Sequence, residues 1–221
     1  MKKWVRNNSL SLVLLGLFGA IIFGQSLVGL RNYNQEQQEH QEATASYSQY
    51  IRSGDFVESV FENWESEFLQ MGAFVILTVF LYQKGSPESK KLIGSEAVDR
   101  KPRRSKSKDG PWPVRRGGLI LKLYEHSLSS AFLLLFLVSF GLYAYGGARA
   151  TCEENLVHGQ GDCPGVVQYV GTSKFWFESL QNWQSEFLAV AAIVVLAIFL
   201  REKGSPESKP VNAPHHQTGS E

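Results

Sequence analysis

The chain has 221 residues, 43% of them hydrophobic, and a formal net charge of +1 at pH 7. These averages would suit a soluble domain, but the charged residues are concentrated outside four apolar stretches. Two of these stretches are long enough to cross a bilayer, so the sorting argues against a soluble domain and indicates a membrane protein.

The first apolar stretch, 10–30, has 21 residues without a charge. A helix needs about 20 apolar residues to cross the hydrocarbon layer, so this stretch predicts a membrane span. The basic start of the chain, with Lys2, Lys3 and Arg6, could instead belong to a cleaved signal peptide. We favour a span because the corresponding stretch 128–147 lies in mid-chain, where cleavage is implausible.

The other two apolar stretches are shorter, with 15 uncharged residues at 68–82 and 14 at 187–200. Runs of that length also occur as buried core helices in soluble proteins. Each follows a full-length span, however, so we interpret both as second crossings whose outer ends are polar. Asp55 and Glu58 form a capping-box pattern that predicts a helix start at residue 56, and Gly85 predicts the helix end.

Segment 56–90 recurs at 175–209 without a gap, at an offset of 119 residues. The 35 aligned pairs contain 19 identities, including Asn-Trp-x-Ser-Glu-Phe-Leu and a closing Lys-Gly-Ser-Pro-Glu-Ser-Lys. We therefore predict an all-α membrane protein with four transmembrane helices, arranged as two tandem, parallel-repeat helical hairpins. The predicted spans are about 10–30 and 64–83 in the first repeat and about 127–147 and 183–201 in the second.

The domain organisation follows from this duplication. The predicted segments are a first repeat (1–90), a basic cytoplasmic linker (91–118), a second repeat (119–209) and a disordered tail (210–221). The linker has no hydrophobic periodicity, and the tail contains two prolines and no apolar run.

The distribution of charge predicts the orientation. Segment 84–122 carries twelve basic residues and four acids, whereas 31–65 carries two basic residues and seven acids. By the positive-inside rule, both termini and the basic segment are cytoplasmic, and the acidic loops face outward from the bacterial cytoplasmic membrane. The basic segment could also attract anionic lipid headgroups, at about 1 kcal/mol per base. It has no aromatic platform or groove-reading helix, so we expect no nucleic-acid partner.

Both cysteines, Cys152 and Cys163, lie in the second outward loop. An oxidising compartment and a short separation favour a disulfide, which would stabilise the loop by about 3 kcal/mol. A redox pair would need closer spacing than these ten intervening residues. His158 lies between the cysteines, but two cysteines and one histidine are one ligand short of a closed zinc site. We therefore expect no metal and no cofactor.

The duplicated polar motif is the candidate functional site. Ionisable residues within spans are costly and usually functional, and Glu67 and Glu186 fall just inside the outer boundary. If the two carboxylates converge, the pair could bind a cation or relay a proton. The alternative is an interfacial belt in which the tryptophans anchor at headgroup level and the glutamates are solvated. The candidate residues are Glu67, Glu186, Asn63, Asn182, Trp64, Trp183, Ser66 and Ser185.

The pattern Trp-x-Ser-Glu-Phe-Leu, an apolar helix and Lys-Gly-Ser-Pro-Glu-Ser-Lys resembles an uncharacterised family, a domain of unknown function, of small bacterial four-span membrane proteins. The opening Asn-x-Ser-Leu-Ser-Leu is similar to that family as well. The resemblance covers nearly the whole chain. It implies membrane location and a four-span architecture, and it carries no assigned activity.

The sequence contains no Gly-x-Ser-x-Gly elbow, Walker loop, His-Glu-x-x-His or Cys-x-x-Cys motif, so we do not expect an enzyme. We predict a non-enzymatic structural or partner-binding envelope protein. The alternative is a small oligomeric transporter or ion/proton conduit that uses Glu67 and Glu186, and a membrane enzyme ranks third. The expected partners are the bilayer and either a second copy or another membrane protein. A conduit requires both glutamates to be buried around a cavity, whereas a structural role leaves them exposed at the interface.

Overall fold

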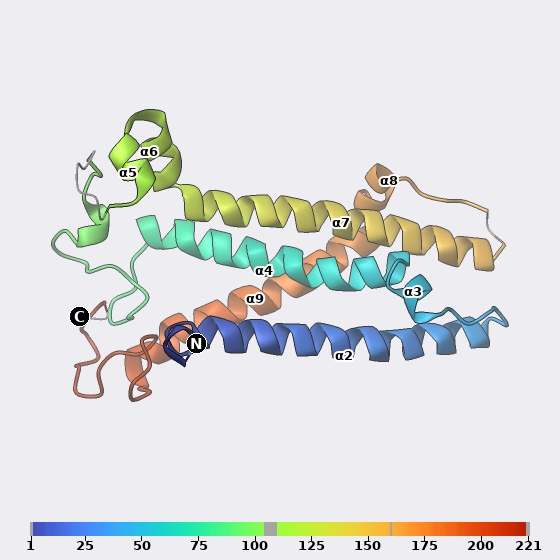
Figure 1. The fold of residues 1–221 in the computed structure, drawn as a ribbon, viewed down its shortest axis with the longest axis horizontal. Helices are drawn as coiled ribbons and strands as arrows, with labels where there is room; N and C mark the ends of the chain where they lie inside the picture. Colours follow the sequence, from blue (N-terminus) through green and yellow to red (C-terminus); the bar gives the residue numbers. More distant parts are fainter. Residues whose placement is uncertain (1, 104–109, 160, 220–221) are drawn as a thin grey trace. The chain divides into compact units, whose positions relative to one another are not determined.

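The computed structural model describes residues 2–103, 110–159 and 161–219, and all regular structure in these ranges is helical (Figure 1). The long helices are α2 (Ser9–Glu39), α4 (Gly54–Phe80), α7 (Ser127–Val157) and α9 (Ser173–Phe199). The short ones are α1 (Lys2–Asn7), α3 (Tyr47–Tyr50), α5 (Trp112–Arg116), α6 (Gly118–Glu125) and α8 (Val166–Val170), with a 3-10 turn at Ala97–Asp99. The predicted all-α class is confirmed.

Three of the long helices, α2, α7 and α9, are long and apolar enough to cross a membrane. Their apolar side chains are largely exposed, as Leu10 at 71% and Leu188 at 69% illustrate. Such surfaces are suited to lipid rather than to water, which supports a membrane protein. Helix α4 is less apolar and falls outside this group, so a fourth span stays a prediction.

The chain forms two compact units. Unit 1 comprises Met1–Phe61 and Gly141–Phe175, and unit 2 comprises Glu62–Phe140 and Trp176–Glu221. Helices α4, α7 and α9 contribute residues to both units. Each unit therefore contains parts of both sequence repeats, and the domain boundaries drawn from the sequence stay predictions.

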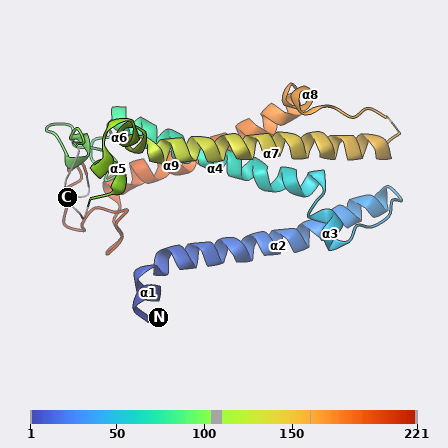
Figure 2. The same ribbon diagram turned by 45° about the horizontal axis from the view of Figure 1, so that its top comes forward.

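Two tyrosines at equivalent sequence positions, Tyr50 and Tyr169, organise unit 1. They are 2% and 1% exposed. Tyr50 lies on α3, which packs beside the last part of α2 (Figure 2). A Cβ at Gly29 of α2 would collide with the Tyr50 hydroxyl group, and a Cβ at Gly147 of α7 would collide with the Tyr169 ring. The two glycines therefore provide the space in which each tyrosine ring packs against a long helix.

Hydroxyl side chains cap the helices that follow these tyrosines. Ser53 Oγ donates to the Tyr50 carbonyl at 2.7 Å and accepts from the Phe56 amide at 3.2 Å. Thr172 Oγ1 makes the equivalent bonds at the start of α9, at 2.7 and 3.3 Å. The predicted cap at Asp55 is therefore wrong. The helix begins two residues earlier than expected, because the Ser53 hydroxyl reaches the free amide in its first turn.

Unit 1 also contains a close crossing of α4 and α7. A Cβ at Gly54 would lie 2.3 Å from the Ala150 nitrogen, and one at Gly146 would lie 2.5 Å from the Glu58 nitrogen. The backbones approach so closely because neither glycine has a side chain, as at many small-residue contacts between membrane helices.

In unit 2, both copies of Lys-Gly-Ser-Pro-Glu-Ser-Lys adopt the same loop. Gly85 and Gly204 have φ angles of +89° and +88°, which glycine adopts without strain. The Gln83 amide donates to Ser89 Oγ at 2.9 Å, and in the second copy the Glu202 amide donates to Ser208 Oγ at 3.0 Å. Helix α4 ends at Phe80, five residues before Gly85, so Gly85 forms the turn of the loop and does not cap the helix as predicted.

The described part of the C-terminal tail contacts these loops. Lys209 is 1% exposed and donates to the carbonyls of Pro214, His215 and Gln217 at 3.0–3.3 Å. The Gly85 amide donates to Thr218 Oγ1 at 2.9 Å. The residues after the second loop therefore bond to the first loop.

Candidate functional site

The sequence-predicted site residues all lie in unit 2, but their burial differs. Glu67 is exposed, and Glu186 is half-buried. Among the described residues, the fully buried carboxylate is Glu65, with 0% exposure, which was not among the predicted site residues. It occupies the variable position of Trp-x-Ser-Glu, where the second copy has Gln184, so comparison of the repeats gave no signal for it. Of the other candidates, Ser66 is buried, Trp64, Asn182 and Trp183 are half-buried, and Asn63 and Ser185 are exposed.

Two hydrogen bonds join α4 to α9 near the repeated motif. Trp183 Nε1 donates to Glu65 Oε1 at 3.0 Å, and Asn182 Nδ2 donates to Glu62 Oε1 at 2.8 Å. Glu62 and Glu65 are three residues apart and so share a face of α4. The donors belong to the second repeat and the acceptors to the first. We call these four residues the α4–α9 tie.

The motif serines bond within their own helices. Ser66 Oγ donates to the Asn63 carbonyl at 2.7 Å, and Ser185 Oγ donates to the Asn182 carbonyl at 2.8 Å. Both bonds span three residues and satisfy each hydroxyl locally. The hydroxyl protons of the two serines are therefore occupied in the same way in both repeats.

Two buried oxygens beside the tie lack a hydrogen bond of good geometry. Glu65 Oε2 and Ser179 Oγ belong to residues that are 0% exposed, and the Ser179 hydroxyl is the neighbouring donor for the Glu65 carboxylate. An unsatisfied buried polar group is costly and calls for a proton, a water molecule or a functional explanation. Glu65 is therefore the carboxyl group of unit 2 with the strongest claim to a role beyond packing.

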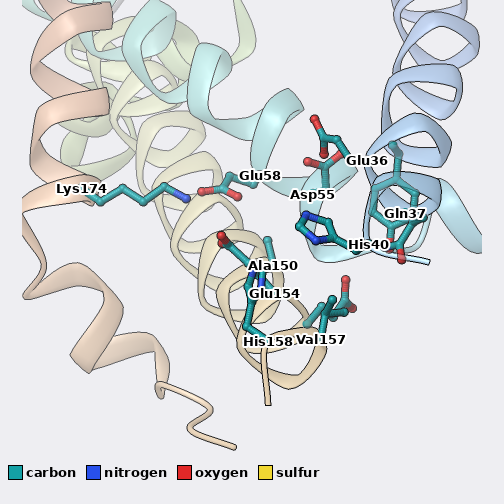
Figure 3. A pocket seen from close by; sticks show the side chains of 12 residues that line it. Glu36, Gln37, His40, Asp55, Glu58, Ala150, Glu154, Val157, His158 and Lys174 are labelled. Carbon is teal, nitrogen blue, oxygen red and sulfur yellow. The ribbon is translucent and has the colours of Figure 1, made fainter. Parts of the chain in front are cut away.

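Unit 1 contains a cleft with a volume of about 310 Å³, bordered by α2, the start of α4 and the last part of α7 (Figure 3). Five carboxyl groups line it together with one lysine and two histidines. The charged residues are Glu36, Asp55, Glu58, Glu153, Glu154 and Lys174. We call this feature the acidic cleft.

Burial raises the pKa of Asp55 in the acidic cleft, and the charges of Glu36 and Glu153 raise it further, whereas Lys174 opposes the shift. The neighbouring Glu58 accepts a 2.5 Å hydrogen bond from the Tyr169 hydroxyl. No group of three or more His, Cys, Asp or Glu residues within the described ranges is arranged to hold a metal ion.

The last part of α7 is held by covalent and polar contacts within unit 1. Cys152 and Cys163 form the predicted disulfide, which is thereby confirmed. Arg149 Nη1 donates to the Arg52 carbonyl at 2.6 Å, and its Nε forms an ion pair with Glu153 at 2.9 Å. The last part of α7, which lines the acidic cleft, is therefore held in place by a disulfide, a hydrogen bond and an ion pair.

A family model described as "Domain of unknown function" (DUF6766) matches residues 1–220. The chain belongs to this family. The predicted resemblance to an uncharacterised family is thus confirmed, and no curated protein and no solved structure matches the chain. Membership of DUF6766 brings no activity with it, and the α4–α9 tie and the acidic cleft are the features that bear on function.

Proposed function

We propose that this DUF6766 member is a four-span protein of the bacterial cytoplasmic membrane with a non-enzymatic, structural and partner-binding role in the envelope. The observation that carries the proposal is the α4–α9 tie. Its two hydrogen bonds use the duplicated motif to join one helix to the other. The motif therefore contributes to assembly of the helices.

The tie also supports α4 as the fourth span. Its 27 residues extend about 40 Å, which exceeds the ~30 Å hydrocarbon thickness. Its low apolar content is due in part to Glu62 and Glu65, and both bond to α9 instead of facing lipid. Polar residues in membrane helices are tolerated in such positions because they find partners within the protein.

Equivalent local structures support the proposed tandem hairpins. The tyrosines Tyr50 and Tyr169 pack against glycines in both repeats, and the Gly-Ser-Pro loops have matching bonds. With the basic connection in the cytoplasm, both hairpins would insert in the same direction.

The partner-binding part of the proposal rests on the acidic cleft, which would face outward in this topology. A cleft lined mainly by one sign of charge concentrates oppositely charged ligands. Its five carboxyl groups exceed its single lysine, so it favours a partner that presents basic groups.

A proton conduit is the second candidate function, and one observation favours it. Oε2 of Glu65 is a buried acidic oxygen beside the α4–α9 contact, without a hydrogen bond of good geometry. A proton conduit that uses an enclosed Glu67–Glu186 pair has less support than one that uses Glu65, because Glu67 is exposed.

Proteoliposomes loaded with a pH-sensitive dye separate the two functions. For the structural role, we expect no proton flux above that of empty liposomes, and Glu65→Gln should leave the flux unchanged. Flux that Glu65→Gln abolishes, while the Glu67→Gln control retains it, would overturn the structural role in favour of the conduit.

A double-mutant cycle tests the tie directly. Trp183→Phe, which removes the donor, and Glu65→Leu, which removes the acceptor, are expected to couple by about 0.6 kcal/mol, the average for hydrogen bonds between membrane helices. The measurement is unfolding in mixed micelles, with Ser185→Ala as a control that leaves the tie intact. Additive effects of the two substitutions would contradict the proposed role of the motif.

A further inference from the structure

Helices α5 and α6 form a short hairpin directly before α7. Gly117 and Gly118, at the turn, have φ angles of +73° and +63°, a region that favours glycine. Helix α6 ends at Glu125, and α7, an apolar helix long enough to span a membrane, begins at Ser127. Figure 1 shows both short helices beside the first turns of α7. The hairpin is therefore held within a few residues of the point at which α7 would enter the bilayer.

Helix α6 exposes large apolar side chains on one face. Leu119 and Leu123 are 78% and 74% exposed and lie one helical turn apart. Leu121, on the opposite face of α6, is only 8% exposed and packs inward. Trp112 of α5 is also 57% exposed. A helix with one packed face and one exposed apolar face, next to a span, is typical of segments that lie in the membrane interface.

The charge of the hairpin is complementary to one kind of lipid. Arg115 and Arg116 lie in the last turn of α5, and Lys122 lies in α6 beside the exposed leucines. Glu125 is the one acidic residue between 112 and 125. Basic side chains beside an apolar interfacial face attract anionic headgroups, and tryptophan is enriched at the same depth.

We propose that the α5–α6 hairpin is an interfacial anchor that inserts Trp112, Leu119 and Leu123 into the cytoplasmic leaflet and binds anionic phospholipid. This inference rests on the proposed topology, in which the basic segment 84–122 is cytoplasmic. It assigns the lipid contact to helices α5 and α6, and not to the whole basic segment 84–122. It also adds a hydrophobic contribution, which a purely electrostatic contact would lack.

Quenching of tryptophan fluorescence by brominated lipids tests the anchor in proteoliposomes of the full chain. The difference between wild type and Trp112→Phe isolates the Trp112 signal from the other tryptophans. We expect phospholipids brominated near the headgroup to quench Trp112 more than lipids brominated at the chain end. The quenching should increase when the vesicles contain phosphatidylglycerol.

Two sets of variants separate the apolar and charged contributions. Leu119→Ser with Leu123→Ser should abolish the Trp112 quenching, while Ile93→Ser, at a 92% exposed position outside the hairpin, should not. Arg116→Gln and Lys122→Gln should each weaken the response to phosphatidylglycerol, by up to about fivefold. Lys101→Gln, outside the hairpin, is the matched control for charge.

The outcomes distinguish this inference from the proposed function. If Trp112 is not quenched while the tryptophans of the proposed spans are, the anchor is wrong and the membrane protein stands. If no tryptophan is quenched, the proposed membrane function fails as well. Equal quenching of Trp112 with and without phosphatidylglycerol would overturn the assignment of anionic lipid.

Discussion

The two copies of Asn-Trp-x-Ser-Glu-Phe-Leu have nearly the same sequence but opposite roles in the α4–α9 tie. The first copy and the residue before it supply the acceptors, with Glu65 at the variable position and Glu62 directly before Asn63. The second copy supplies the donors, Asn182 and Trp183, and has glutamines at the positions equivalent to the two acids. The residues that both copies share place the side chains at equivalent positions. The residues that differ decide which copy accepts and which copy donates the hydrogen bonds.

This difference has an electrostatic reason. Acids in both copies would bring four carboxylates to one helix contact in a low-dielectric setting, where like charges strongly disfavour ionisation. Gln181 and Gln184 in the second copy remove two of those charges. The duplicated helices can therefore pair without a cluster of like charges.

The largest expected difference between the repeats comes from the disulfide, because the first repeat has no cysteine. Reduction, or replacement of Cys152 and Cys163 by serine, should lower the free energy of unfolding by about 3 kcal/mol. Thermal unfolding in mixed micelles, with and without reductant, measures this loss. The double Cys→Ser variant is the control, because reductant should not change its midpoint.

A second comparison concerns the equivalent positions Gly54 and Ser173. A Cβ at Gly54 would clash with the backbone of Ala150, so Gly54→Ser should destabilise the protein by about 2 kcal/mol. Ser173 is exposed, so Ser173→Gly should change the free energy of unfolding by less than about 0.5 kcal/mol. Equal effects in chemical denaturation would show that the close crossing of α4 and α7 contributes nothing.

The equivalent positions Glu65 and Gln184 give a smaller contrast. Glu65→Leu removes the acceptor of the Trp183 indole and should cost about 1 kcal/mol. Gln184→Leu, at an exposed position, should have little effect. A blue shift of the Trp183 emission in Glu65→Leu alone would accompany the loss of the bond. No loss of stability in Glu65→Leu would argue against the tie.

The smallest expected effect is a pH dependence of the two Gly-Ser-Pro loops. Burial raises the pKa of Glu88, and the carboxyl group of Glu207, which shares a hydrogen bond with it, raises the pKa further. The folded state therefore holds its proton more tightly than the unfolded state. The resulting stabilisation is present below the unfolded pKa of about 4.3 and is lost as the pH rises through the raised value.

Unfolding midpoints of wild type and Glu88→Gln, measured across this pH range, test whether the contact between Glu88 and Glu207 causes the pH dependence. Both side chains are partly exposed, so solvent should keep the difference small. Glu88→Gln should flatten the pH dependence, whereas Glu202→Gln, on an exposed residue outside the pair, should preserve it. If the pH dependence of the unfolding midpoint is the same in Glu88→Gln as in wild type, the Glu88–Glu207 contact does not contribute to it.

Features that depend on short stretches of chain were predictable. The apolar runs at 10–30 and 128–147 lie within α2 and α7. The disulfide was also predictable, because two cysteines in one loop have few alternatives. The cap at Ser53 was missed because Ser53 and Asp55 are both suitable capping residues. Which of them caps the helix depends on which side chain reaches the first-turn amides.

The sequence by itself determined that the chain is helical, has apolar stretches long enough to cross a membrane and contains a repeated segment, because helix length, apolar content and repetition are properties of consecutive residues. Only the tertiary structure decided that Glu65, and not Glu67, is buried. These two acids are two positions apart, so they project from different sides of α4, and the side that meets α9 is set by helix packing. The acidic cleft likewise required contacts between distant segments, which no local pattern in the sequence contains.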